Sequence, residues 1–135
     1  FPEPAMIGRA DVIAMPHIGA STEESEENCA VMAANQIMDY LENGNIANSV
    51  NFPAVNMPRS AGASRITFAN DNVSGVLGHV LSILAEHEVN VIDMVNKSRA
   101  ELAFNIIDVE RCPDAEVILA IQATPHVIRV RVLGA

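Results

Sequence analysis

The chain has 135 residues, half of them hydrophobic, which suffices for the core of about one ordinary domain together with an appended segment. Its 17 acidic and 8 basic residues give a formal net charge of −9, which repels a phosphate backbone and argues against nucleic acid as a partner. No apolar run approaches the roughly 20 residues that span a bilayer, and no basic stretch followed by a hydrophobic one opens the chain. We therefore expect a soluble, cytoplasmic protein with no membrane partner.

Near the N-terminus, Asp11–Met15 form a short apolar run that ends at Pro16. Such a run is typical of a buried strand in a parallel sheet. A parallel sheet needs more strands than the nearby sequence supplies, so this strand is expected to derive from a larger α/β body.

A long helix is predicted over residues 22–43. Ser21 and Glu24 have the spacing of a capping box, further acidic residues follow in the first turns, and Gly44 is a stop signal. Apolar residues cover more than one side of this helix, which predicts several packing partners. They are Ala30, Val31, Met32, Ala33, Ala34, Ile37, Met38 and Leu41.

The segment 47–63 carries Pro53, Pro58 and Gly62 and sustains no helical or strand period, so it marks a boundary between two units. We place the first unit at residues 1–56, the linker at 57–63 and the second unit at 64–135.

The second unit opens with a strand around Ile66, and apolar residues at helical spacing then predict a helix over 75–87. Residues 89–96 and 102–109 are β-branched runs separated by residues 97–100, whose composition is that of a hairpin loop. The two runs should therefore pair antiparallel.

The last two elements are a helix from Pro113 to about Ala123 and a strand over 127–132, in which Ile128, Val130 and Val132 should share the buried face. The resulting order is βαββαβ, an α+β fold of the ferredoxin-like kind. We expect a four-stranded antiparallel sheet with two helices on one face.

Cys29 and Cys112 have no CxxC spacing and no histidine cluster beside them, so the sequence predicts no disulfide framework and no metal site. Both are expected to be small buried or half-buried hydrophobes.

The string Pro16–Thr22 (PHIGAST), followed by an acidic helix and then Asn51-Phe52-Pro53, resembles the D-2-hydroxyacid dehydrogenases. The βαββαβ unit that follows resembles the ACT domain at the C-terminus of the phosphoglycerate branch of that family. The resemblance implies that residues 1–56 are the end of an α/β dehydrogenase body with its crossover helix, and that residues 64–135 are a regulatory ACT domain.

On this resemblance His17 matches the catalytic histidine that accepts the substrate hydroxyl proton while a hydride passes to NAD. An imidazole suits that role because its pKa lies near neutrality. The family's dinucleotide-binding glycines, substrate-binding arginine and histidine-pairing carboxylate lie upstream of the residue that matches Phe1. The parent protein would therefore use NAD, whereas this chain alone is expected to bind no cofactor and to catalyse nothing.

The resemblance also implies an effector site between two ACT domains, which would bind L-serine or a similar small amino acid and make the protein a homo-oligomer. The loop Asn70–Val76 would come from one copy, with Asn70, Asn72, Gly75 and Val76 as its contacts, and Asn90 from the neighbour. Backbone N–H groups at a helix start can bind a carboxylate, and side-chain amides offer both donors and acceptors to a zwitterion.

Three residues depart from the family pattern. Ser74 stands where the family usually has proline, Asn70 where a close relative has histidine, and Glu88 where glycine commonly ends the first ACT helix. Two alternatives to serine feedback on a dehydrogenase stay open. The ACT domain could act only as an oligomerisation module, or it could sense an amino acid for another enzyme.

Overall fold

The computed structural model describes residues 3–134, which fall into one compact unit up to Asn35 and a second from Gln36 onward. The first contains the short 3-10 helix η1 (Pro4–Met6) and most of α1 (Glu23–Asn43). The elements of the second are β1 (Ser64–Asp71), α2 (Val76–Glu86), β2 (Val91–Arg99), β3 (Leu102–Val109), α3 (Ala115–Ala123) and β4 (Val127–Leu133). This unit is longer than the expected domain 64–135, because it also includes residues 36–63.

The strand predicted at Asp11–Met15 is not formed, and this prediction was wrong. The segment is irregular and mostly exposed, with Ile13 at 88% and Met15 at 73% relative exposure. A parallel strand must exchange hydrogen bonds with neighbouring strands. The described part of the first unit contains no strand that could pair with it.

The helix predicted over residues 22–43 is present, but its cap is shifted by one residue. The Thr22 hydroxyl, rather than Ser21, accepts a hydrogen bond from the Ser25 amide at 3.2 Å, and the Thr22 carbonyl accepts from the Glu26 amide at 2.9 Å. None of the α1 side chains is buried. The expectation that Cys29 and Cys112 are buried was also wrong, since both are exposed.

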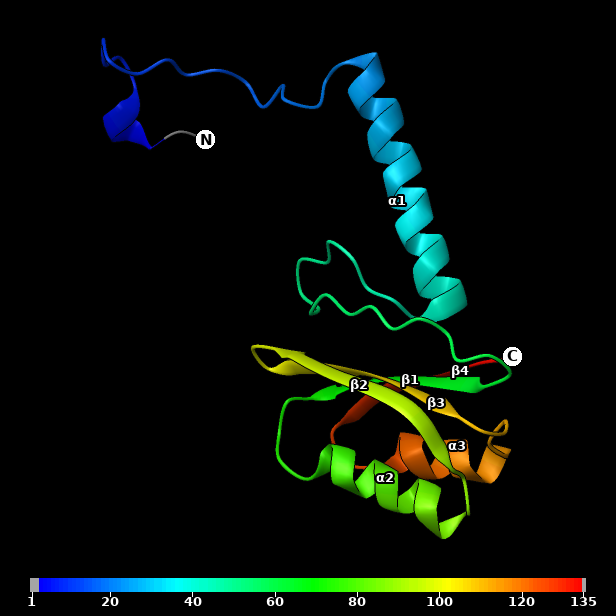
Figure 1. Cartoon of the computed structure of the whole chain (residues 1–135). Coiled ribbons are helices and arrows are strands. Elements are labelled where there is room, and N and C mark those ends of the chain that lie inside the picture. The colour runs from blue at the N-terminus through cyan, green and yellow to red at the C-terminus, as the bar shows by residue number, and fades with distance from the viewer. Residues whose placement is uncertain (1–2, 135) are drawn as a thin grey trace. The chain divides into compact units, whose positions relative to one another are not determined.

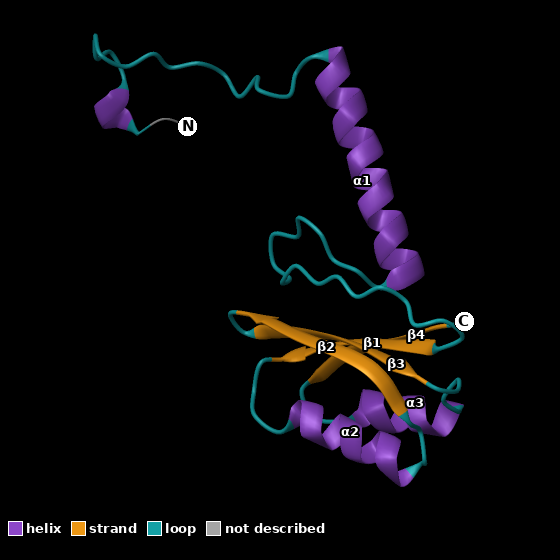
Figure 2. Cartoon of the chain, in the orientation of Figure 1, coloured by secondary structure: helices purple, strands orange, loops and turns teal. Residues whose placement is uncertain are grey.

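The βαββαβ prediction is confirmed by a sheet of order β2-β3-β1-β4, in which every paired neighbour is antiparallel. Figures 1 and 2 show α2 and α3 together on one face of this sheet. The core on that face is an apolar cluster of buried residues from the sheet and both helices. Its members are Ile66, Phe68, Val80, Ile83, Leu84, Val89, Ile107, Val109, Val117 and Ile121.

Two features of the sheet differ from the sequence prediction: the length of the β2–β3 hairpin loop and the register of β4. The strands of the β2–β3 hairpin run on to Arg99 and Leu102, so the connection is only Ala100-Glu101 rather than a four-residue loop. In β4 a register shift opposite Ala69 and Asn70 inserts an extra residue, which leaves Ile128 half exposed instead of buried.

The other face of the sheet is covered by residues 40–57, which pack as a second apolar cluster. Its buried members are Val55, Met57, Ala69, Phe104 and Ile106, with Tyr40, Ile46, Phe52 and Val95 around them. The Ile46 and Val55 backbones bond each other in both directions, at 2.8 and 3.0 Å. Because both faces are covered, β1 and β3 are buried along nearly their whole lengths.

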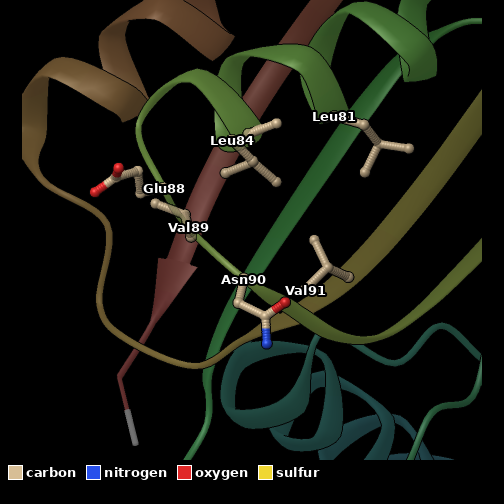
Figure 3. Close-up of a pocket in the computed structure, with 7 residues that line it drawn as sticks. Leu81, Leu84, Glu88, Val89, Asn90 and Val91 are labelled. Atoms are coloured by element: carbon tan, nitrogen blue, oxygen red, sulfur yellow. The ribbon is translucent and has the colours of Figure 1, made fainter.

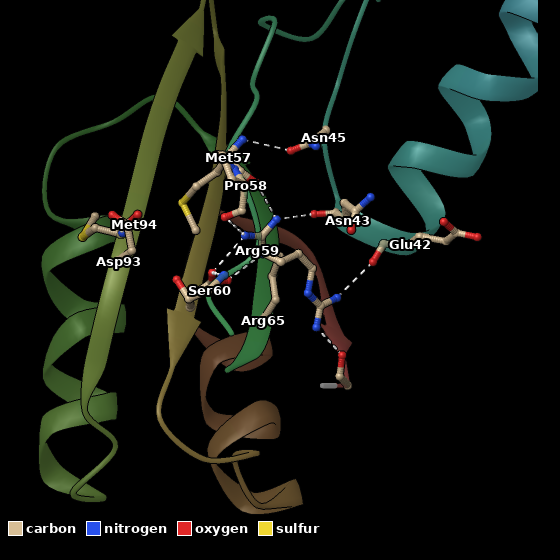
Figure 4. Close-up of polar contacts among 12 residues, drawn as sticks. Glu42, Asn43, Asn45, Met57, Pro58, Arg59, Ser60, Arg65, Asp93 and Met94 are labelled. Atoms are coloured by element: carbon tan, nitrogen blue, oxygen red, sulfur yellow. Dashed lines mark hydrogen bonds and ion pairs between the residues drawn. The ribbon is translucent and has the colours of Figure 1, made fainter. Parts of the chain in front are cut away.

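Arginines from the sheet and the linker fix the end of α1 (Figure 4). Arg131 donates to the carbonyls of Tyr40 and Leu41 at 3.3 and 3.1 Å, and Arg59 donates to that of Glu42 at 3.0 Å. These bonds satisfy carbonyls that a helix C-terminus leaves without intrahelical partners and place positive charge at the negative end of the helix dipole.

Arg65 is the most deeply buried of these arginines. It donates to the Asn43 and Met57 carbonyls at 2.8 Å each and makes a two-point ion pair with Asp108, at 2.6 and 2.9 Å. Both side chains of the pair are at most 1% exposed. This pair joins the end of α1, the linker and the sheet within one unit.

Gly44 ends α1 with φ +76°, and a Cβ there would lie 2.5 Å from Thr67 Cγ2. Gly44→Ala is expected to lower the free energy of unfolding by more than the roughly 1–2 kcal/mol that a left-handed backbone costs, because the methyl also clashes. Gly62→Ala is the matched control, since Gly62 has φ +74° but open space around its Cα. Urea unfolding of the two variants should show the larger loss in Gly44→Ala; equal losses would contradict the close packing on Thr67.

Candidate functional site

The loop between β1 and α2 carries Asn72 and Gly75, while Asn70 lies near the end of β1 and Val76 begins α2; the loop is tied to its neighbours at several points. The Asn72 amide donates to the Glu101 carbonyl at 2.8 Å, and its side chain donates to the Ala100 carbonyl at 3.0 Å. The Asp71 amide donates to the His126 carbonyl at 2.9 Å. The loop is therefore held between the β2–β3 hairpin on one side and the start of β4 on the other.

Gly75 makes the sharp turn into α2 with φ +93°, and nothing lies within 4 Å of where its Cβ would be. Its carbonyl accepts the first helical bond, from the His79 amide at 2.9 Å, and no side chain caps the helix start. The amides in the first turn of a helix have no intrahelical acceptor and favour anions. The Gly75 and Val76 amides are the groups that the sequence predicts to bind a carboxylate; Gly75 is exposed, whereas Val76 is 5% exposed.

Asn70 is turned into the protein. It is 4% exposed, its Oδ1 accepts from Asn105 Nδ2 at 2.7 Å, and its Nδ2 donates to the Asp71 carbonyl at 2.6 Å. An amide nitrogen has two hydrogens, so at most one N–H of Asn70 remains for a ligand. The structure thus places Asn72 and Gly75 on an exposed loop, Val76 at the buried start of α2 with 5% exposure, and Asn70 beneath the loop.

Asn90 lies at the opposite end of α2, just before β2, and its side chain is exposed. Figure 3 shows it among the residues that line an open groove, with Leu81 and Leu84 on α2 and Val91 at the start of β2. Since α2 has 11 residues at about 1.5 Å rise each, it separates Asn90 from Gly75 by roughly 16 Å. One chain therefore cannot contact the same small amino acid with both residues.

Glu88, which forms part of the same groove, adopts the left-handed φ of +55°. Its amide donates to the Ala85 carbonyl at 3.0 Å, and the Val89 amide donates to the Leu84 carbonyl at 2.8 Å. This closing pattern usually has glycine at the left-handed position. Glu88 therefore keeps the geometry that ends the helix, but because it has a side chain, the left-handed backbone conformation costs free energy that glycine would not lose.

His17 belongs to the first unit and is exposed on an irregular segment. It lies with Met6 of η1 and with Ile13 and Met15 around an open hollow. No carboxylate or arginine of the described first unit is among the residues that line the hollow, so the catalytic role of His17 stays a prediction of the resemblance.

Two further features were not predicted: the buried Arg65–Asp108 pair, and an amide row formed by Asn70, Asn105 and Asn96. Asn105 is fully buried between Phe104 and Ile106, in a strand whose other polar residue is Asp108. The amide of Asn105 within a run of mostly apolar residues was a signal for such a network, because a buried polar side chain needs a hydrogen-bond partner.

Two kinds of feature are absent from the described residues. No helix of residues 3–134 is long and apolar enough to cross a membrane. Over the same range, no three or more histidine, cysteine or acidic side chains gather in a way that could hold a metal ion.

The strand order and the two helices on one face of the sheet define a ferredoxin-like α+β fold, as predicted. Similar solved structures include an ACT domain protein from Streptococcus pneumoniae, with a TM-score of 0.46 and 21% identity, covering 56% of this chain and 92% of that one. The ACT domain of the GTP pyrophosphokinase of Chlorobium tepidum has a TM-score of 0.44 and 9% identity, covering 53% of this chain and 96% of that one. No protein-family model matches the chain.

By sequence, the chain is related to the C-terminal part of D-3-phosphoglycerate dehydrogenase, which confirms the predicted resemblance. The Escherichia coli K12 enzyme of that name is 34% identical over 125 residues, and that of Dictyostelium discoideum is 35% identical over 123. In both cases the match covers 91% of this chain and 30% of the relative. The chain thus spans about a third of the length of these dehydrogenases.

Proposed function

We propose that the chain is the regulatory part of an NAD-dependent D-3-phosphoglycerate dehydrogenase, and that two copies of its ACT unit bind L-serine between them as a feedback effector. The observation that supports this proposal most directly is that the two halves of the predicted effector site are far apart within one chain. The loop with Asn72 and Gly75 lies at one end of α2 and Asn90 at the other. Each half is exposed and needs a second copy to complete it.

The two edges of the sheet favour β2 as the contact between copies. At the β4 edge, the Gln122 side chain donates to the Ile128 carbonyl at 3.4 Å and accepts from the Val130 amide at 3.0 Å. It thereby occupies groups that an added strand would use. Strand β2 has β3 on one side only, so its other side offers backbone donors and acceptors to a second copy.

A two-fold axis beside β2 would also bring the two half-sites together. The start of β2, at Val91, is level with Val109 and hence with Ser64 at the beginning of β1. Its far end, at Arg99, is level with Leu102 and hence with Asp71. Antiparallel pairing of two β2 strands therefore directs Asn90 of one copy toward the loop of the other.

The ligand chemistry follows from the groups at this junction. The amides at the start of α2 suit the serine carboxylate, and the amide side chains of Asn72 and Asn90 suit its ammonium and hydroxyl groups. Because the Asn70 side chain is buried and already bonds Asn105 and Asp71, we propose fewer direct contacts to the ligand than the resemblance implies. If serine does not bind, the dimer alone would support the alternative role as an oligomerisation module.

L-Serine titrated calorimetrically into the full chain should give saturable heat, and Asn90→Ala should weaken binding about 5- to 100-fold, because the lost hydrogen bonds include a charge-assisted one. Light scattering should show a dimer for both proteins. Glu110→Ala is a matched control, since the Glu110 backbone bonds the Asn90 carbonyl but its side chain is exposed. A strictly monomeric chain, or equal serine affinity in wild type and Asn90→Ala, would contradict the proposal.

A further inference from the structure

Three asparagine side chains form a continuous row across three strands, on the side of the sheet that faces α2 and α3. Asn96 of β2 is directly opposite Asn105 of β3, and Asn105 is one diagonal step from Asn70 of β1. Asn96 Nδ2 donates to Asn105 Oδ1 at 2.6 Å, and Asn105 Nδ2 donates to Asn70 Oδ1 at 2.7 Å. The row therefore connects an edge strand to the interior of the sheet.

All the links in this row run in one direction. Asn96 donates to Asn105, Asn105 donates to Asn70, and the last donor, Asn70 Nδ2, bonds the Asp71 carbonyl at 2.6 Å. Hydrogen bonds in such a chain polarise and strengthen one another. The final acceptor also takes the Val73 amide at 2.8 Å, so the row ends on the carbonyl that closes the first turn of the effector loop.

The row occupies positions at which the same strands elsewhere place apolar side chains. Phe68 and Ile107, on the same face, belong to the apolar core cluster. Asn105 and Asn70 are buried to a similar degree, at 0% and 4% exposure, but their side chains are polar. Burying amides costs free energy unless every group finds a partner. Among the described residues, no buried side-chain nitrogen or oxygen lacks a hydrogen bond. The network is thus complete, and losing one member leaves the next without its partner.

We propose that Asn96 and Asn105 are positioning residues for the effector loop, and that the amide row couples that loop to the β2 edge. This inference deepens the proposed function, on which the identity of the ligand and of the second copy rests. A copy that pairs along β2 restricts the backbone that carries Asn96. That restriction passes through Asn105 and Asn70 to the Asp71 carbonyl, and so to the loop that carries Asn72 and Gly75.

Hydrogen exchange of single amides in Asn96→Leu tests the coupling without any ligand. Leu is close in size to Asn but donates no hydrogen bond, and Asn96 is at the exposed edge, so the fold should persist. The amides of Asn72 and Val73, two strands away, should exchange about 3- to 10-fold faster, as the loss of one net hydrogen bond predicts. Ser98→Ala, the next residue on the same face of β2, should leave them unchanged.

Asn96→Gln should restore slow exchange, because it keeps the amide donor, whereas a merely structural role of Asn96 would make both substitutions alike. Equal exchange at Asn72 and Val73 in wild type and Asn96→Leu would overturn the inference. Serine titration of the same proteins should show weaker binding in Asn96→Leu than in Asn96→Gln. If wild type binds no serine, the proposed function fails, and the exchange result still decides whether the row positions the loop.

Discussion

Asp108→Asn is expected to lower the free energy of unfolding by about 3–5 kcal/mol, which is the usual cost of leaving a buried charge without its partner. The Asp108 carboxylate accepts from Arg65 through both oxygens, and Oδ2 also accepts from the Ser60 amide at 2.9 Å. Asparagine has only one oxygen, so its NH₂ group would face a donor while the guanidinium stays buried. Urea unfolding followed by circular dichroism measures the loss.

The exposed Arg9–Asp11 pair has the same two-point geometry, at 2.9 and 2.6 Å, and is the matched control. Its side chains are 57% and 67% exposed, so Asp11→Asn should cause no measurable change in unfolding. A small effect of Asp108→Asn, similar to that of Asp11→Asn, would contradict the structural role of the buried pair.

The pH dependence of unfolding gives a second measurement on Asp108. Burial raises the pKa of this carboxyl, but hydrogen bonds from Arg65 and Ser60 outweigh burial and hold the pKa below its usual value. A depressed folded-state pKa stabilises the fold above the unfolded-state pKa of about 3.9, and this stability is lost as the pH falls through the folded-state pKa. The difference in unfolding free energy between wild type and Asp108→Asn should therefore shrink as the pH falls below about 4.

Phe104→Ala is expected to cost about 3–5 kcal/mol and to release residues 40–57 from the sheet. Phe104 is 4% exposed, with ring centroids 6.0 Å from Phe52, edge-on at 81°, and 6.4 Å from Tyr40. Such aromatic pairs add to the burial of the ring itself. Truncating the ring leaves a cavity beneath residues 40–57 rather than beneath the helices.

Amide hydrogen exchange can show on which side of the sheet the cavity lies, with a cavity on the opposite side as the control. Amide exchange at Ile46 and Val55, which bond each other, should accelerate in Phe104→Ala beyond the change in global stability. Phe68→Ala makes a similar cavity on the helix-facing side, since Phe68 is 1% exposed there. Equal acceleration at Ile46 and Val55 in both variants would show that residues 40–57 do not pack independently on Phe104.

The elements of the βαββαβ domain and helix α1 could be predicted from the sequence because these strands and helices have clear periods or end signals. Strand β3 occupies the predicted residues 102–109, and α1 begins one residue after the predicted start. The hairpin loop was predicted too long because its turn contains Ala100 at φ +51° rather than glycine, so no turn signal was visible. The bulge that exposes Ile128 depends on pairing with β1 and has no signal within β4.

The inward position of Asn70 agrees with strand periodicity, because Asn70 alternates with Ile66 and Phe68, which face the core. The rest of the candidate site was harder to predict, because its contacts join different strands. The partners of Asn105 come from two other strands, and the partners of Arg65 come from β3, α1 and the linker. Such contacts depend on register and tertiary packing, which no single segment of the sequence specifies.

Mixing Asn72→Ala with Asn90→Ala tests most directly whether two copies share the site. Each variant alone removes the same half of both sites in its dimer and should bind serine weakly. In a dimer with one copy of each, one site has both alterations and the other has neither. Random exchange of subunits should therefore restore about a quarter of the wild-type sites, at wild-type affinity. Calorimetry that shows this recovery on mixing supports the account, and binding by the mixture equal to the average of the two variants would contradict it.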